Sequence, residues 1–267
     1  MLRSELLEQI HQTQSYLCVG LDTDPEQIPA YLHKEAHTPM LAFNQAIIEA
    51  TAPYCAAYKL NTAFYEAEGA KGWAIMKDTI DAIPPGKMVI ADAKRGDIGN
   101  TASKYAEAFF DELNVDAITV SPYMGHDAIT PFLAYPDKMV IVLALTTNPG
   151  AMDYQYLSAS HKPIYEHVMA TVSKLASPEN LMFVVGGTRP DALKAIRSQY
   201  PHHGLLVPGI GSQGGTMEQV LENGSGPGQA LLINVSRGIL YQDSTKQFAL
   251  AAAKQAAHYQ RLMQQYL

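Results

Sequence analysis

The chain has 267 residues, of which 47% are hydrophobic and 17% are charged, and its formal net charge is −7. This composition is typical of a folded globular protein and argues against an intrinsically disordered chain. The acidic balance and the absence of any run of Lys and Arg argue against nucleic-acid binding, because neutralising phosphates needs clustered positive charge.

Short apolar runs rich in β-branched residues alternate along the chain with longer amphipathic segments. The apolar runs predict strands at Tyr16–Leu21, Ala56–Leu60, Met88–Ala91, Ala117–Val120, Met139–Leu145, Leu181–Val185, Gly204–Val207 and Ala230–Val235. The amphipathic segments predict helices at Pro39–Tyr54, Gly69–Ala82, Gly99–Leu113, Pro163–Ala176, Pro190–Gln199 and Lys246–Tyr266. Thr38, directly before Pro39, is expected to cap its helix.

Repetition of strand and helix eight times is the pattern of parallel βαβ units. A single (β/α)8 barrel typically takes roughly 250 residues, so we predict the α/β class with one TIM-barrel domain over residues 1–267. An open doubly wound sheet is the alternative architecture. The glycine-rich segment 224–228 precedes the last strand, so it is interpreted as a turn and not as a phosphate-binding loop.

Three charged residues follow the third predicted strand, where the catalytic loops of a barrel converge. Asp92 and Lys94 are two residues apart and are expected to face the same side of the strand, while Asp97 falls in the loop beyond. Lys59 and Asn61 end the neighbouring strand. These groups could form a plain ion-pair cluster that closes the barrel, but their density favours a functional site, since unpaired buried charge is unfavourable.

A lysine placed between two carboxylates is held protonated, because opposite charges nearby raise its pKa. Such an ammonium can donate a proton but is a poor amine nucleophile. The carboxylates would repel an anionic group beside them, and a substrate carboxylate that leaves as CO2 loses this repulsion. An array of this kind could therefore serve a decarboxylation, in which the Lys94 ammonium would meet the carbanion left behind.

The sequence from Asp92 to Thr101 reads Asp-Ala-Lys-Arg-Gly-Asp-Ile-Gly-Asn-Thr. This motif resembles the signature of orotidine 5′-phosphate decarboxylases, in the form found in their larger bacterial subgroup. The resemblance covers most of the chain. It implies a cofactor-free barrel that converts orotidine 5′-monophosphate to uridine 5′-monophosphate in pyrimidine biosynthesis.

The resemblance also implies roles for individual residues. Asp22, in Gly-Leu-Asp after the first strand, would contact the ribose, and Lys59 would bridge the ribose and the carboxylate array. Lys94 would deliver the proton to C6 of the pyrimidine. Asp97 and Thr101 would complete the site of a partner subunit, which implies a homodimer with shared active sites.

The loops after the seventh and eighth strands are the usual phosphate site of a barrel. Arg237 can hold a phosphate through two hydrogen bonds, and the resemblance adds Gln213 as a bridge between phosphate and pyrimidine. Ser236 stands where many family members have glycine, so its backbone amide is expected to serve the phosphate. Thr147, after the fifth strand, would meet the imide edge of the base, and Asn61 is a further substrate-binding candidate.

Three other functions stay open at this point. A related lyase acting on a keto-sugar phosphate would need a divalent metal held by carboxylates. A Schiff-base aldolase would need a lysine of lowered pKa, which Asp92 and Asp97 oppose. A catalytically inactive barrel could bind a nucleotide for regulation.

Nothing in the sequence indicates secretion, a membrane span or a metal site. Residues 1–14 are polar, and no stretch reaches the roughly 18 apolar residues of a transmembrane helix. Cys18 and Cys55 are too few for a disulfide framework, and neither they nor the nine histidines show metal-ligand spacing. We therefore expect a cytoplasmic protein with reduced thiols, no cofactor and no membrane or nucleic-acid partner.

Overall fold

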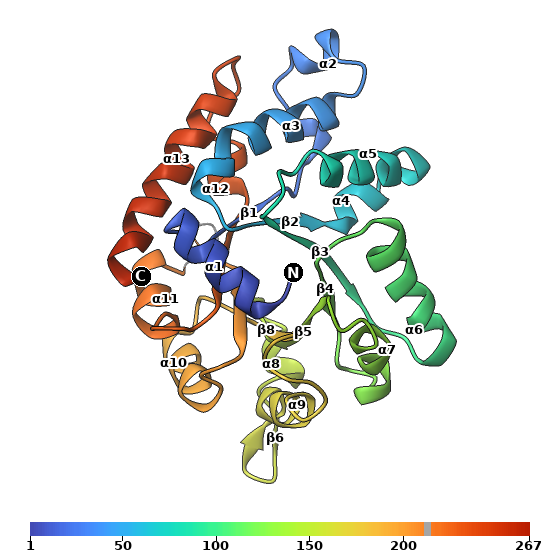
Figure 1. The fold of residues 1–267 in the computed structure, drawn as a ribbon, viewed down its shortest axis with the longest axis vertical. Coiled ribbons are helices and arrows are strands. Elements are labelled where there is room, and N and C mark those ends of the chain that lie inside the picture. Colours follow the sequence, from blue (N-terminus) through green and yellow to red (C-terminus); the bar gives the residue numbers. More distant parts are fainter. Residues whose placement is uncertain (211–214) are drawn as a thin grey trace.

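The computed structural model describes residues 1–210 and 215–267, and a closed barrel of parallel strands forms its centre (Figure 1). The strands follow one another around the barrel in the order β1-β10-β9-β8-β5-β4-β3-β2. Their bounds are β1 (Leu17–Gly20), β2 (Ala57–Asn61), β3 (Met88–Arg95), β4 (Ala117–Val120), β5 (Met139–Leu145), β8 (Leu181–Val185), β9 (Gly204–Val207) and β10 (Leu231–Val235). The predicted barrel is confirmed, and the open sheet is excluded because β1 pairs with both β2 and β10.

Helices surround the barrel and cover its outer face. They are α1 (Arg3–Thr13), α2 (Leu32–Glu35), α3 (Pro39–Thr51), α4 (Thr62–Glu66), α5 (Gly69–Asp81), α6 (Gly99–Ala106), α7 (Thr130–Leu133), α8 (Ala151–Tyr154), α9 (Ile164–Val172), α10 (Pro190–Gln199), α11 (Met217–Gly224), α12 (Arg237–Leu240) and α13 (Phe248–Met263). A small antiparallel hairpin of β6 (Ser158–Ala159) and β7 (Lys162–Pro163) precedes α9.

The predicted helices are present, with local differences that have physical causes. The segment 99–113 continues from α6 into a π-helical stretch, Glu107–Glu112. Pro163 is extended and belongs to β7, so α9 begins one residue later than predicted. Thr38 occupies the N-cap position of α3, but its side chain makes no capping hydrogen bond, and Pro39 alone supplies the start signal.

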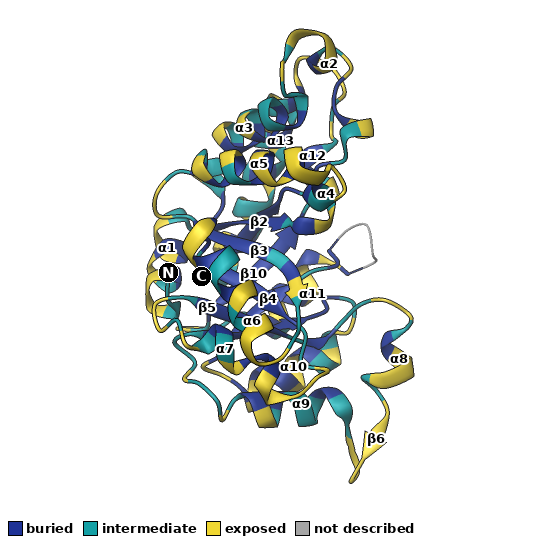
Figure 2. Cartoon of the chain, turned by 90° about the vertical axis from the view of Figure 1, so that its right-hand side faces the viewer, coloured by how far each residue is buried: buried dark blue, intermediate teal, exposed yellow. Residues whose placement is uncertain are grey.

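Burial explains why the strands read as continuous apolar runs. All residues of β1, β4, β8, β9 and β10 are buried, because one face of each strand fills the barrel interior and the other packs under helices (Figure 2). Such two-sided burial is the rule for parallel sheets. In the described part of the chain, no helix is long and apolar enough to cross a membrane.

The amino-terminal helix closes one end of the barrel. The ammonium group of Met1 pairs with Asp116 at 2.9 Å, directly before β4, and Arg3 donates to the carbonyl of Gly228, shortly before β10. Gly228 itself has φ +68° in a turn, as expected for the glycine-rich segment. In Figure 2, α1 lies on one side of the barrel, and α8 and β6 lie on the other. The amino-terminal helix therefore lies at the amino ends of the strands, and the loops that follow their carboxyl ends lie on the opposite side.

A buried histidine at this end of the structure predicts a pH effect on stability. His203 packs against Phe183 and Tyr200, and burial, helped by nearby positive charge, lowers its pKa to about 4. The unfolded chain binds a proton near pH 6.5, whereas the folded chain does not until about pH 4. Stability is therefore lost as the pH falls through this window, and it is retained above it.

Replacing His203 with phenylalanine should remove this pH dependence while keeping a ring in place. When the pH is lowered from 7 to 4.5, the free energy of unfolding should fall by about 2 kcal/mol less in the variant than in the wild type. Urea denaturation at the two pH values measures the difference. An unchanged difference would show that protonation of this imidazole does not limit acid stability.

Candidate active site

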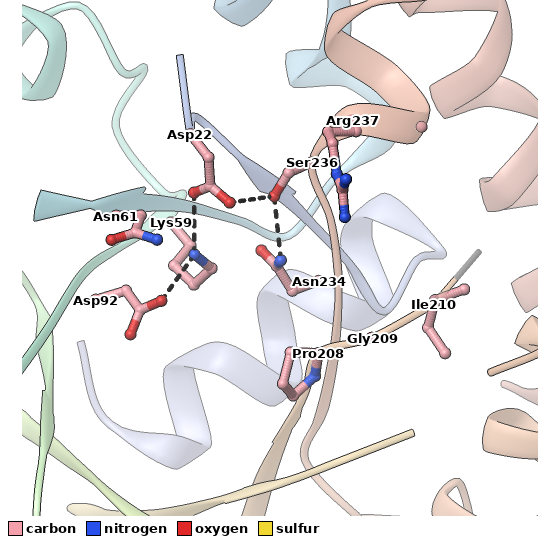
Figure 3. A pocket seen from close by; sticks show the side chains of 11 residues that line it. Asp22, Lys59, Asn61, Asp92, Pro208, Gly209, Ile210, Asn234, Ser236 and Arg237 are labelled. Atoms are coloured by element: carbon pink, nitrogen blue, oxygen red, sulfur yellow. Dashed lines mark hydrogen bonds and ion pairs between the residues drawn. The ribbon is translucent and has the colours of Figure 1, made fainter. Parts of the chain in front are cut away.

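A polar pocket of about 200 Å³ lies at the carboxyl ends of the strands (Figure 3). Its walls come from β1, β2, β3, β9 and β10 and from the segments that follow them. The lining residues are Asp22, Lys59, Asn61, Asp92, Pro208, Gly209, Ile210, Asn234, Ser236, Arg237 and Gly238. Most of the residues predicted from the first, second, third and eighth strands therefore meet in one cavity.

Lys59 is the buried cation at the centre of this pocket. Its side chain is 4% exposed, and its ammonium lies 3.2 Å from Asp22 Oδ1 and 3.0 Å from Asp92 Oδ2. Burial disfavours the charged form, but the two carboxylates outweigh burial and raise the pKa of Lys59 above its ordinary value. Lys59 is thus a fixed positive charge, which excludes it as the unprotonated amine that a Schiff-base mechanism requires.

Asp92 is held between two lysines. Its Oδ2 faces Lys59, while its Oδ1 accepts hydrogen bonds from Lys94 Nζ at 2.6 Å and from the Thr119 hydroxyl at 2.9 Å. Burial favours the neutral acid, yet the two ammonium groups prevail and hold the pKa of Asp92 well below its usual range. The carboxylate therefore stays ionised at neutral pH and presents negative charge beside the Lys94 ammonium.

Lys94 meets Asp92 as predicted, but the regular strand alternation assumed for the pair is wrong. β3 extends to Arg95, and its pairing with β4 shifts between Ala91 and Arg95. Within this bulge Lys94 has φ +48°, in the left-handed region that residues other than glycine rarely adopt. The side chain remains 48% exposed, so the ammonium can exchange protons with water.

The ribose-binding candidate Asp22, which follows β1, is anchored from the adjacent strand β10. The Ser236 hydroxyl donates to Asp22 Oδ2 at 2.8 Å, and Asn234 Nδ2 donates to Ser236 Oγ at 3.3 Å. Gly20 makes room for this contact, because a Cβ there would lie 2.0 Å from Ser236 Oγ. Ser236 therefore uses its hydroxyl to orient Asp22, a role that sequence reasoning did not assign to it.

The other end of the pocket carries the phosphate candidates. Arg237 begins α12 directly after β10, and Gly209 follows β9 with φ +96°. Both line the pocket together with Gly238. Gln213, predicted to join phosphate and base, lies outside the described residues.

Four predicted residues of the described structure are not among those that line this pocket: Lys94, which meets it through its pair with Asp92, and Asp97, Thr101 and Thr147. Asp97 lies in the loop before α6, where its carboxylate accepts the amide of Ile98 at 2.8 Å, and no ion pair of Asp97 occurs in the described structure. Thr101 is exposed in the first turn of α6. Thr147 packs against Gly186, since a Cβ on that glycine would lie 2.6 Å from its methyl group.

Two polar residues of the site were missed by sequence reasoning, and of these Asn234 lines the pocket whereas Thr119 lies behind Asp92. Thr119 on β4 bonds to Asp92, and Asn234 on β10 bonds to Ser236 and has a buried side-chain oxygen with no partner among the described residues. Each interrupts an otherwise apolar strand. A buried polar residue in such a strand needs a partner, and that is the signal that could have identified both.

The remaining candidates take no part in the pocket. Cys18 and Cys55 are free and buried, and burial raises the pKa of both thiols, to about 11 for Cys55. Within residues 1–210 and 215–267, no group of three or more His, Cys, Asp and Glu side chains is placed to hold a metal ion.

The pocket thus combines an ionised carboxylate flanked by ammonium groups at one end with an arginine and glycine-rich backbone at the other. Comparison with known proteins agrees with this arrangement. The chain is 48% identical to orotidine 5′-phosphate decarboxylase of Phocaeicola vulgatus, covering 100% of this chain and 99% of the relative. It is 49% identical to the Christiangramia forsetii protein of the same name, covering 98% and 97% of the two chains.

Solved structures give the same assignment. Leishmania donovani OMP decarboxylase matches with a TM-score of 0.84 and 39% identity over 99% of both chains. The UMP synthase of the same organism matches with a TM-score of 0.81 and 40% identity, over 96% of this chain and 56% of the larger protein. The family model described as Orotidine 5′-phosphate decarboxylase / HUMPS family matches residues 15–252, and the chain belongs to that family.

Proposed function

We propose that this chain, acting as a single barrel domain, decarboxylates orotidine 5′-monophosphate to uridine 5′-monophosphate in pyrimidine biosynthesis, with Lys94 as the proton donor to C6. The observation that carries the proposal is the 2.6 Å pair of Lys94 and the ionised Asp92 at the mouth of a pocket whose far end holds Arg237. Relatives named orotidine 5′-phosphate decarboxylase match nearly the whole chain, which supports this substrate.

The chemistry follows from the charges. When the C6–carboxylate bond breaks, the substrate releases CO2 and the bonding electron pair stays on C6. The carboxylate of Asp92 disfavours the anionic ground state, and the Lys94 ammonium stabilises the carbanion and then transfers a proton to C6. The neutral lysine left behind regains a proton from solvent, to which its side chain is 48% exposed. The reaction drawn in this way needs no cofactor.

A continuous set of hydrogen bonds supports the substrate along the pocket. Lys59 joins Asp92 to Asp22, and Ser236 ties Asp22 to the strand that leads into Arg237. We infer that Asp22 and Lys59 bind the ribose hydroxyls between the reacting base and the phosphate. Asn61 also lines this part of the pocket; its side-chain oxygen caps α4 and its NH2 group is the donor offered to substrate. We propose Thr147 and Gln213 as the contacts to the pyrimidine.

The active unit is proposed to be a homodimer with shared sites. Asp97 is not paired with Lys94 of its own chain in the described structure, and Thr101 is exposed on α6. Apolar side chains stand exposed around these residues. Ile98 is 50% exposed beside Asp97, and Tyr123 is 85% exposed in the neighbouring loop after β4. Burial of these side chains by a second subunit would bring its Asp97 to Lys94.

Consumption of orotidine 5′-monophosphate, followed by ultraviolet absorbance with the purified chain, tests the function. We expect turnover to proceed in EDTA, with uridine 5′-monophosphate and CO2 as the products. Activity that is lost in EDTA and restored by a divalent cation would indicate a metal-dependent lyase of the same family instead. A protein that binds the nucleotide without consuming it would be the inactive binding barrel.

Replacing Arg237 with alanine should lower kcat/KM through loss of phosphate recognition. A charge-assisted hydrogen bond contributes roughly 1.5–3 kcal/mol, so the loss for the nucleotide is expected to be on the order of 10²-fold. The phosphate-free nucleoside should react at nearly the same rate with both proteins. Arg261→Ala, on the exposed face of α13, is the control and should leave kcat/KM unchanged for both substrates. Equal losses on nucleotide and nucleoside would place Arg237 away from the phosphate.

A further inference from the structure

Pairing between β3 and β4 is interrupted at one place, beside the reacting groups. The two strands are in register at Ala91 and Ile118 and again at Arg95 and Val120. Three residues of β3, 92–94, therefore lie opposite the single residue Thr119. A bulge of this kind leaves backbone groups without their ladder partners and redirects the side chains that it carries.

The buried hydroxyl of Thr119 provides hydrogen-bond partners for groups in the bulge. Thr119 is 0% exposed, and its Oγ1 accepts the backbone N–H of Lys94 at 2.9 Å. The same oxygen donates to Asp92 Oδ1 at 2.9 Å. Because a hydroxyl has a single proton, accepting from Lys94 and donating to Asp92 fixes its direction.

These contacts close a small ring around the proposed proton donor. Asp92 Oδ1, which receives the Thr119 hydroxyl, also receives the Lys94 ammonium at 2.6 Å. Lys94 is therefore held at both ends, through its backbone amide by Thr119 and through its ammonium by Asp92. Its left-handed backbone, φ +48°, is an unfavourable conformation that such contacts can maintain.

We propose that Thr119 is a positioning residue for the decarboxylation, and this inference rests on the proposed function. Its hydroxyl sets the bulge at Lys94 and the rotamer of Asp92 together, so that the ammonium is aligned with C6 when the carbanion forms. Thr119 itself does not line the pocket and does not touch the substrate. Its contribution therefore belongs to kcat and not to substrate binding.

The decisive comparison is between Thr119→Val, which keeps the branched shape and removes the hydroxyl, and Thr119→Ser, which keeps the hydroxyl. Misplacing a catalytic group by a small distance can reduce the rate by about 10²-fold. We expect a loss of that order in kcat for the valine variant, with KM close to wild type. The serine variant should retain most of the wild-type kcat. Calorimetric titration with uridine 5′-monophosphate gives the number of sites that bind the nucleotide in each preparation. Dividing the turnover rate by this number gives kcat per folded, binding-competent site.

Thr51→Val is the matched control. Thr51 is also 0% exposed and also uses its hydroxyl in buried hydrogen bonds, to Ile47 O at 2.7 Å and Tyr58 at 2.9 Å, but it lies on α3 away from the pocket. This variant should lose stability without losing kcat per site. A purely structural role for Thr119 would make the two valine variants behave alike.

Several outcomes would overturn the inference. Wild-type kcat in Thr119→Val, or a loss as large in Thr119→Ser as in the valine variant, would show that the hydroxyl does not position Lys94. If the valine variant does not fold, Thr119→Ala takes its place, and failure of both to fold while serine folds would assign the hydroxyl to stability. A wild-type protein that leaves orotidylate untouched would instead refute the proposed function, and the inference with it.

Discussion

Replacing Lys94 with alanine is expected to abolish turnover of orotidine 5′-monophosphate while the barrel stays folded. General acid catalysis contributes about 10²–10⁴-fold, and loss of carbanion stabilisation adds to this. Folding should be spared because the Lys94 side chain is 48% exposed and Asp92 keeps its contacts with Lys59 and Thr119. Steady-state kinetics and a thermal melt of the purified variant provide the two measurements.

Lys77→Ala offers a closely matched control for this experiment. Lys77 Nζ pairs with Asp81 at 2.6 Å, the same distance as in the Lys94 pair, and its side chain is 40% exposed on α5. Loss of this surface pair should leave kcat unchanged, since exposed ion pairs contribute little. If Lys94→Ala keeps more than about a tenth of wild-type activity, above what loss of a general acid allows, the proposed proton donor is wrong.

Two inactive variants, Lys94→Ala and Asp97→Ala, should restore activity when their subunits are exchanged. In a shared site Lys94 comes from one chain and Asp97 from the other, so a mixed dimer has one site with both defects and one intact site. Random exchange of equal amounts makes about half of the dimers mixed, and roughly a quarter of wild-type activity should return. Activity is measured after exchange, and native mass spectrometry verifies the mixed dimers.

A second pair of variants makes this test specific. Asp92 and Lys94 lie in the same site of the same chain, 2.6 Å apart, so Asp92→Asn and Lys94→Ala cannot produce an intact site in any combination. Mixing these two should restore nothing. If the exchange of Lys94→Ala with Asp97→Ala is complete and restores nothing either, Asp97 acts within its own chain and the shared-site arrangement must be abandoned.

Much of the fold is readable from local pattern. Seven of the predicted strands lie within a residue of the observed elements at both ends, because two-sided burial makes each barrel strand a short apolar run. The exception is the third strand, which extends four residues past its predicted end at Ala91 to Arg95. There the charged residues of the site follow the apolar run, and hydrophobicity ceases to mark the strand.

The sequence by itself also determined which charges gather at the pocket, since residues after successive parallel strands share the carboxyl end of the barrel. Asp22, Lys59 and Asp92 are joined by ion pairs as this rule predicts. Only the tertiary structure decided how they are oriented. Ser236 reaches Asp22 from 214 residues away, and such a contact depends on closure of β10 onto β1.

The conformation of Lys94 was likewise decided by tertiary structure. Strand periodicity predicts that side chains two residues apart share a face, but here a bulge and a left-handed backbone bring Lys94 to Asp92. The hydroxyl that supports this geometry belongs to Thr119 on the next strand, 25 residues further along the chain. Local sequence pattern reports burial and backbone preference over a few residues, whereas the direction of a side chain in a bulge is set by the neighbouring strand that satisfies it.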